Sequence, residues 1–83
     1  MPPEDLQKRL RQRPFRPFRL HLTDGATYEV QHPELVLLGR RSLVLGLAQD
    51  PAQTLYDRTV DVDLLHIVRL ESADPGGRPN GAG

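Results

Sequence analysis

Residues 18–30, FRLHLTDGATYEV, carry the clearest secondary-structure signal in the chain. Apolar and polar side chains alternate along its first half, and this period of two is typical of a half-buried strand. The two faces are Phe18, Leu20 and Leu22 on one side and Arg19, His21 and Thr23 on the other. Asp24-Gly25 then favours the positive backbone dihedrals of a tight turn, and the alternation resumes at Tyr28. We therefore predict a β-hairpin here.

On the N-terminal side of the hairpin, residues 2–12 predict one short helix. Prolines stand in the first turn, acidic residues follow them, and basic residues close the last turn, as the helix dipole favours. Leu6 and Leu10 are four residues apart and share one face, which has to pack on the rest of the protein because so short a helix is marginal alone. Pro14 ends the helix.

The second half of the chain predicts further short strands. They cover residues 43–45, 55–62 and 66–70, with a tight turn at residues 63–65 before the last strand. Residues 35–38, LVLL, are too short a run to distinguish a strand from a helical turn. About five strands and one helix predict a mainly β fold, a small five-stranded antiparallel barrel with a short N-terminal helix.

The size of the chain allows one small domain. It has 83 residues, a mass of 9.4 kDa and 37% hydrophobic residues, too few apolar side chains to fill two cores. We place the domain at residues 1–72 and predict a disordered tail at residues 73–83, which are rich in glycine and proline. The small core and the exposed strand edges favour a homo-oligomer that pairs edge to edge.

Charge is balanced in total but not along the chain. The formal net charge is zero, yet residues 1–19 hold six basic and two acidic side chains, a net charge of +4, and the remainder holds −4. Such a basic segment could steer an anionic partner, or it could lie against an acidic face of its own or a neighbouring subunit. We favour the second interpretation.

Six arginines are the candidate binding residues for nucleic acid or another anionic partner. They are Arg9, Arg13, Arg16, Arg19, Arg40 and Arg41. If they converge on one rim, Phe15 is available to stack on a base. The alternative is that Phe15 and Phe18, the two phenylalanines of the chain, are both buried in the core, and we favour this alternative.

Residue patterns for catalysis or metal binding are weak. The chain has no cysteine, which excludes disulfides and thiolate metal sites, and its histidines, His21, His32 and His66, lack ligand-like spacing. Asp61 and Asp63 share one strand face about 7 Å apart, where a solvated surface is the simpler interpretation. We therefore expect no enzyme activity, no catalytic residues, no cofactor and no metal.

Two further features bear on location. No run approaches eighteen consecutive apolar residues, and the first residues lack the layout of a signal peptide. We expect a soluble, cytoplasmic protein that is not associated with a membrane.

The layout resembles the Sm-like family, and within it the bacterial Hfq branch. The likeness lies in the helix around residues 6–11, the Asp-Gly turn at residues 20–25, the LVLL run at residues 35–38, and the closing pair of strands at residues 60–70. The resemblance implies an SH3-like barrel that forms rings through its edge strands and binds single-stranded RNA. It covers about residues 4–71.

The sequence departs from the family pattern at two places. Tyr56-Asp57-Arg58 stands where the bacterial members carry a Tyr-Lys-His-type RNA motif, so an acid replaces a base. Gln31-His32-Pro33 stands where the family has a glycine that lets the second strand bend. The repeat Arg13-Pro14-Phe15-Arg16-Pro17-Phe18 also resembles small bacterial proteins of unassigned function, a resemblance that implies no activity.

These observations lead to two hypotheses for function. The first is a non-enzymatic, self-associating protein-interaction module. The alternative is a single-stranded RNA-binding protein of the Sm-like or Hfq-like type, with RNA as its partner.

Overall fold

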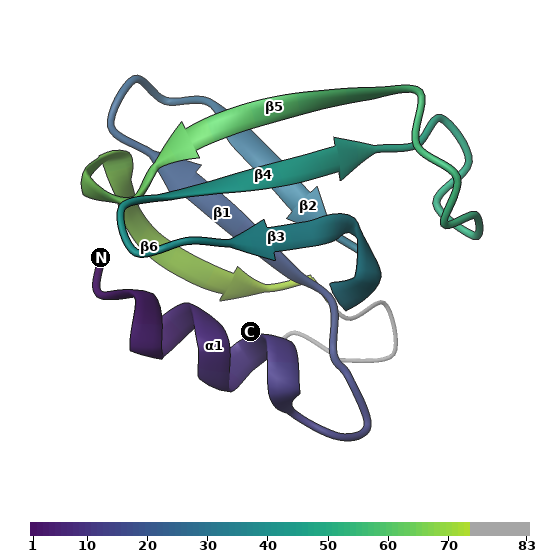
Figure 1. The fold of residues 1–83 in the computed structure, drawn as a ribbon, viewed down its shortest axis with the longest axis horizontal. Helices are drawn as coiled ribbons and strands as arrows, with labels where there is room; N and C mark the ends of the chain where they lie inside the picture. The colour runs from purple at the N-terminus through teal and green to yellow at the C-terminus, as the bar shows by residue number, and fades with distance from the viewer. Residues whose placement is uncertain (74–83) are drawn as a thin grey trace.

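The computed structural model describes residues 1–73, which form one α-helix, six strands and two 3₁₀ turns (Figure 1). In chain order these are α1 (Pro3–Arg11), β1 (Phe18–Leu22), β2 (Thr27–Val30), η1 (Pro33–Leu35), β3 (Val36–Leu38), β4 (Ser42–Leu47), β5 (Arg58–Asp63), η2 (Leu64–His66) and β6 (Ile67–Ser72). The prediction of a mainly β fold with a short N-terminal helix is confirmed.

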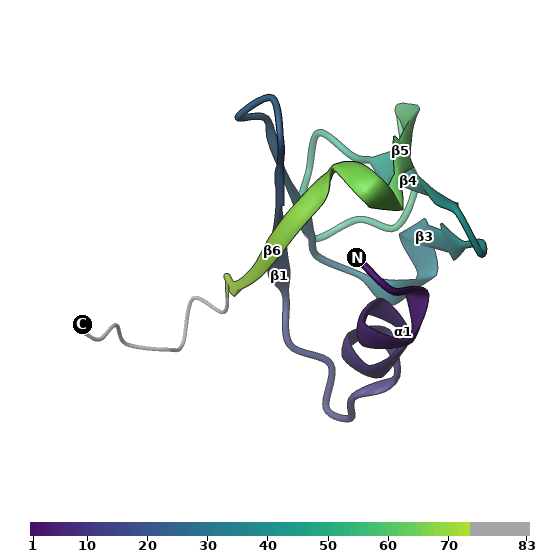
Figure 2. The same cartoon turned by 90° about the vertical axis from the view of Figure 1, so that its left-hand side faces the viewer.

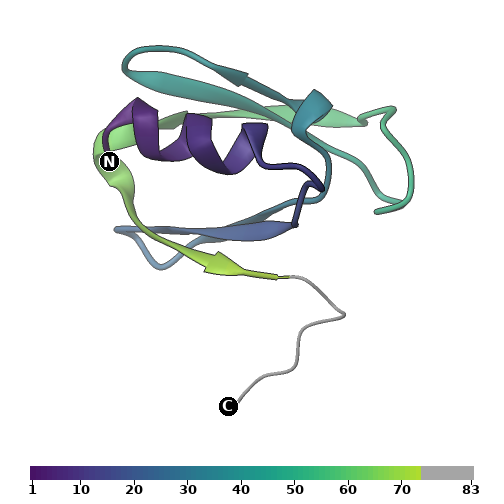
Figure 3. The ribbon, with the colours of Figure 1, turned by 90° about the horizontal axis from the view of Figure 1, so that it is seen from below.

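The strands form two three-stranded antiparallel sheets. One has the order β2-β1-β6, and the other has the order β3-β4-β5. We name them sheet A and sheet B. The two sheets face each other as two layers, and α1 lies across one open side of the pair (Figures 2 and 3). Cross-strand partners in sheet A include Leu20 with Tyr28 and Leu20 with Leu70, and in sheet B they include Leu43 with Val62.

The hairpin of sheet A forms as predicted, and its turn depends on Gly25. The residue has a φ of +87°, which an L-residue adopts only with strain. Its N–H donates to the Leu22 carbonyl at 3.0 Å. The Asp24 carboxylate accepts from the Ala26 N–H at 2.9 Å, the side-chain contact that makes aspartate common in turns.

The prediction of a closed five-stranded barrel is wrong, because a 3₁₀ turn interrupts the strand pairing between β2 and β3. Pro33 has no N–H to donate to a ladder, and it opens η1, in which the Leu35 N–H donates to the His32 carbonyl at 3.1 Å. The strands on either side of η1 therefore belong to different sheets. Of residues 35–38, for which the sequence did not distinguish strand from helical turn, Leu35 ends η1 and Val36–Leu38 form β3.

The strand predicted at residues 55–62 begins later than expected, at Arg58. Asp57 closes the preceding loop, because its N–H donates to the Leu47 carbonyl at 2.8 Å and its carboxylate accepts from the Gln49 N–H at 2.8 Å. Leu55 is consequently an exposed loop residue. The tight turn before the last strand is confirmed as η2.

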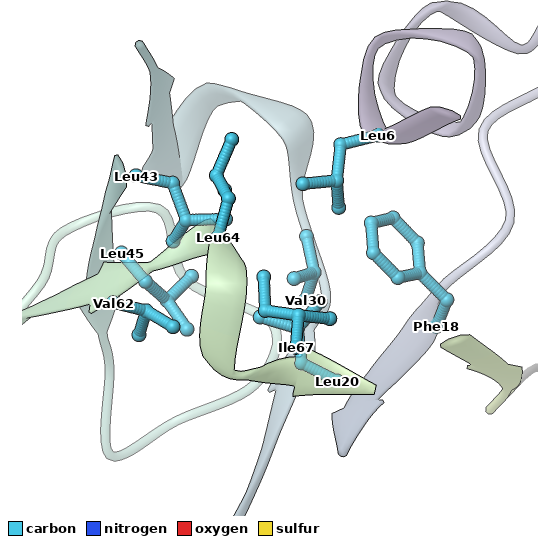
Figure 4. Close-up of a cluster of buried hydrophobic side chains, with 9 residues drawn as sticks. All are labelled: Leu6, Phe18, Leu20, Val30, Leu43, Leu45, Val62, Leu64 and Ile67. Carbon is cyan, nitrogen blue, oxygen red and sulfur yellow. The ribbon is translucent and has the colours of Figure 1, made fainter. Parts of the chain in front are cut away.

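The core joins both sheets to the helix (Figure 4). Its nine buried side chains are Leu6, Phe18, Leu20, Val30, Leu43, Leu45, Val62, Leu64 and Ile67. Leu6 comes from α1 and is 1% exposed, and Leu10 packs partly buried beside it. The predicted leucine face of the helix is therefore its docking face.

Two other sequence predictions concern the C-terminal tail and association with a membrane. Residues 74–83 of the predicted disordered tail lie outside the described residues. Within residues 1–73, α1 is too short and too polar to cross a membrane, and this is the only α-helix found there.

We predict that Gly25→Val lowers the free energy of unfolding by about 1–2 kcal/mol, the cost of holding a side chain in the left-handed region. Nothing lies within 4 Å of a Cβ added at this position, so the loss reports backbone strain rather than a clash. Urea denaturation measures it. Gly25→Asn is the control, because asparagine tolerates this conformation; equal stability of the valine variant and the natural protein would contradict the hairpin geometry.

Candidate functional site

The six candidate arginines are spread over the molecule. Arg40 and Arg41 lie in the turn between β3 and β4, and Arg40 lines a groove with Pro3, Glu4 and Gln7 at the start of α1. Arg13 lies beyond the other end of α1, where its guanidinium donates to the Leu10 and Gln12 carbonyls at 3.0 and 2.9 Å. Nine helical residues span about 13 Å, so the structure does not bring all six together.

Arg9 lies in the last turn of α1, and Arg16 lies in the connector between α1 and β1. The Arg9 guanidinium lies 5.5 Å from the centre of the Phe18 ring, a cation–π contact. Arg16 is exposed. Phe18 is 1% exposed, and the Phe15 and Phe18 ring centres are 6.0 Å apart at 59°. The prediction that Phe18 is a core residue is confirmed, and Phe15 is half-buried against the same core.

Arg19 is held by acidic residues of its own sheet. On the outer face of sheet A, its guanidinium contacts Glu29 of β2 at 2.8 Å and Glu71 of β6 at 2.9 Å. Both glutamates are direct cross-strand neighbours of Arg19. These two hydrogen bonds, the one to Glu29 first, raise the pKa of Arg19. The self-complementary interpretation of the basic segment therefore holds for this residue.

His21 extends the same network. Its Nε2 lies 2.8 Å from Glu71 Oε1, and its Nδ1 lies 3.5 Å from the Arg69 guanidinium. Hydrogen bonds from His21 and then from Arg19 lower the pKa of Glu71. The outer face of sheet A is therefore a partly exposed charge network rather than a free cationic surface.

The histidines lie apart from one another. His32 Nε2 donates to the Pro51 carbonyl at 2.7 Å, and His66 Nδ1 lies 3.1 Å from Thr23 Oγ1. Among residues 1–73, no three histidine or acidic side chains are grouped closely enough to hold a metal ion.

A basic groove runs between α1 and β6, and sequence reasoning did not identify it as a unit. It has a volume of about 770 Å³. Its lining has three cations, one acid, two amides and two apolar residues: Lys8, Arg9, Arg11, Asp5, Gln7, Gln12, Met1 and Leu70. Lys8 and Arg11 are exposed. The +4 charge of residues 1–19 was the available signal, but the sequence could not show that β6 forms the other wall.

The second feature of the site is the open edges of β6 and β5. Sheet A ends in β2 and β6, and sheet B ends in β3 and β5. The Ala73 N–H donates to the Pro17 carbonyl at 3.0 Å, and bonded positions alternate in an antiparallel ladder. The backbone N–H and C=O of Arg69 and Glu71 therefore form hydrogen bonds with β1, whereas those of Leu70 point away from β1 toward the open edge.

The same reasoning defines the edge of β5. The Gly39 N–H donates to the Ser42 carbonyl at 2.8 Å, so alternate residues of β4 bond to β3 and the remaining ones bond to β5. The backbone N–H and C=O of Asp61 consequently point away from sheet B. Unpaired strand edges of this kind are templates for another chain.

The outward faces of the two edges differ in charge. Asp61 and Asp63 are exposed on β5, whereas β6 exposes both Arg69 and Glu71. On the inward faces, Val60 of β5 and Leu70 of β6 are only partly buried. Each edge therefore offers backbone groups, a charged outer side and an apolar inner side.

Comparisons of the chain with protein-family models, with curated proteins and with solved structures find no match.

We predict that Glu71→Gln lowers the melting temperature at pH 7 and that this loss disappears as the pH falls below 4.5. The fold lowers the pKa of Glu71 from its ordinary value of 4.5, so its stabilisation is complete above that pH and is lost as the carboxylate is protonated. Scanning calorimetry between pH 7 and pH 3 measures the difference. Glu34→Gln, an exposed change outside the network, is the control; a loss that is equal at both pH values would contradict the assigned contacts.

Proposed function

We propose that this protein is a non-enzymatic protein-interaction module that associates with copies of itself through its open strand edges. The observation that supports this most strongly is the presence of the open edges β5 and β6, which expose the oppositely charged side chains Asp61 and Arg69. A strand edge with free N–H and C=O groups gains backbone hydrogen bonds when another strand pairs with it.

Parallel pairing of β5 of one copy with β6 of another satisfies both the backbone groups and the side chains of the new ladder. With Asp61 opposite Arg69, the outward N–H of Leu70 donates to the outward carbonyl of Asp61. On the outer face, Asp61 and Arg69 are then cross-strand neighbours, an attractive pair. On the inner face, Val62 is the direct neighbour of Leu70 and Val60 lies diagonally from it, so the partly exposed Val60 and Leu70 lose contact with water. Pairing β5 with β5 would instead place aspartates opposite each other, which is unfavourable.

This interface joins two different edges, so it is heterologous. An assembly of paired copies has one open β5 edge at one end and one open β6 edge at the other, and such contacts generate rings if they close and filaments if they do not. The Sm-like resemblance of the sequence likewise implies ring formation. The RNA binding that it also implies has less support, because the six arginines are dispersed and Phe18 is buried.

We predict that Asp61→Arg and Arg69→Glu each weaken self-association by about 1–2 kcal/mol, roughly ten-fold, because an attractive cross-strand pair becomes repulsive. The double variant Asp61→Arg, Arg69→Glu recovers most of the loss, since the pair is restored with its charges exchanged. Sedimentation velocity over a range of concentrations measures the dissociation constants of the natural protein and of the three variants.

The controls make the same charge changes away from the edges, with Glu34→Arg in η1 and Arg40→Glu in the β3–β4 turn. Neither is expected to alter self-association. A natural protein that stays monomeric at high micromolar concentration would disprove the proposal. A double variant as weak as the two single ones would disprove the β5–β6 pairing.

A further inference from the structure

The groove between α1 and β6 combines three features that suit one kind of ligand. Its helical wall carries the exposed cations Lys8 and Arg11 toward the C-terminal end of α1 and one exposed acid, Asp5, near its start. Its floor is the partly buried, apolar Leu70. The open backbone edge of β6 runs along it, because the N–H and C=O of Leu70 point away from β1. Groove and edge together make a strand-binding surface with a cationic side.

The groove is large enough for a segment of polypeptide. Its volume is about 770 Å³, within the range typical of sites for ligands of drug-like size or larger. Arg9 stands at its inner wall, where the contact with the Phe18 ring fixes the guanidinium at 5.5 Å. Lys8 and Arg11 have no ion-pair partner within residues 1–73, so their charges are available to a ligand.

The lining favours an extended peptide over a nucleic acid. Single-stranded nucleic acids bind where aromatic faces are available for base stacking. Phe18 is 1% exposed, and Phe15 lines a different groove with Arg13 and Pro17. A peptide strand, by contrast, uses the free backbone groups of β6 directly.

We propose that this groove binds an acidic, extended segment of a partner protein, which adds to sheet A as a strand beside β6. Its carboxylates lie against Lys8 and Arg11, and the outer side chains lie beside Arg69. In one respect the proposal rests on the proposed function, because the partner and a second copy of this chain use the same edge. Binding of the partner therefore opposes self-association.

The test uses the Asp61→Arg variant, whose self-association is weakened while its groove and β6 edge are unchanged. The probe is a fluorescein-labelled nine-residue peptide of alternating valine and glutamate, followed by fluorescence anisotropy at low salt. We expect saturable binding that weakens about five-fold or more when Lys8→Gln and Arg11→Gln are added, because two ion pairs are lost.

The matched control adds Arg40→Gln and Arg41→Gln instead, the same loss of charge in the β3–β4 turn, and leaves affinity within about two-fold, because neither arginine lines the groove. A second measurement does not depend on these variants. On adding the peptide, the Leu70 amide of Asp61→Arg becomes protected from hydrogen exchange, while the Glu29 amide on the far edge of sheet A does not.

Three outcomes would overturn the proposal. The first is that the peptide does not bind at low salt, and the second is that both pairs of substitutions reduce its affinity equally. The third is that the Leu70 amide stays unprotected from hydrogen exchange when the peptide is added. Labelled oligouridylate that binds through Lys8 and Arg11 when the peptide does not would identify a nucleic-acid site instead. If the peptide binds but the natural protein never self-associates, only the proposed function fails; if the natural protein self-associates and ignores the peptide, only this inference fails.

Discussion

The break in backbone pairing at Pro33 is the constraint from which the rest of the structure follows. A residue without an N–H cannot continue the ladder from β2 into β3, so η1 interrupts the strand and the six strands divide between two sheets. Each sheet then has its own end strands. The chain leaves sheet B on β5 and enters sheet A on β6 through three residues of η2, so the edge that exposes Asp61 and the edge that exposes Arg69 lie on consecutive strands.

The helix completes this arrangement. Because the sheets are not closed into one barrel, one side of the two layers needs a cover, and α1 supplies it through Leu6 (Figure 3). Arg9 is fixed over Phe18 by the same docking. Lys8 and Arg11, on another face of the helix, line the groove between α1 and β6. One helix therefore supplies a core residue to the fold and the cationic wall of a groove to the surface.

Local features were predictable from the sequence, and long-range ones were not. The Asp24-Gly25 turn, the helix that ends before Pro14 and the turn before β6 depend on neighbours along the chain, where dihedral preferences act. The closure of a barrel and the start of β5 at Arg58 depend on contacts with distant residues, such as the Asp57 N–H with the Leu47 carbonyl. The possibility that the six arginines converge on one rim could not be judged from the sequence for the same reason. Arg19, for example, contacts Glu71 only because of the register between β1 and β6.

The most direct test of β5–β6 pairing between copies is amide hydrogen exchange at each strand edge, measured as a function of protein concentration. If β5 and β6 pair between copies, the Asp61 and Leu70 amides become more protected as concentration rises, because strand pairing occupies them. The Glu29 amide, on the open edge of β2, stays unchanged and serves as the internal reference. Exchange at Asp61 and Leu70 that is equally fast at every concentration would contradict the account.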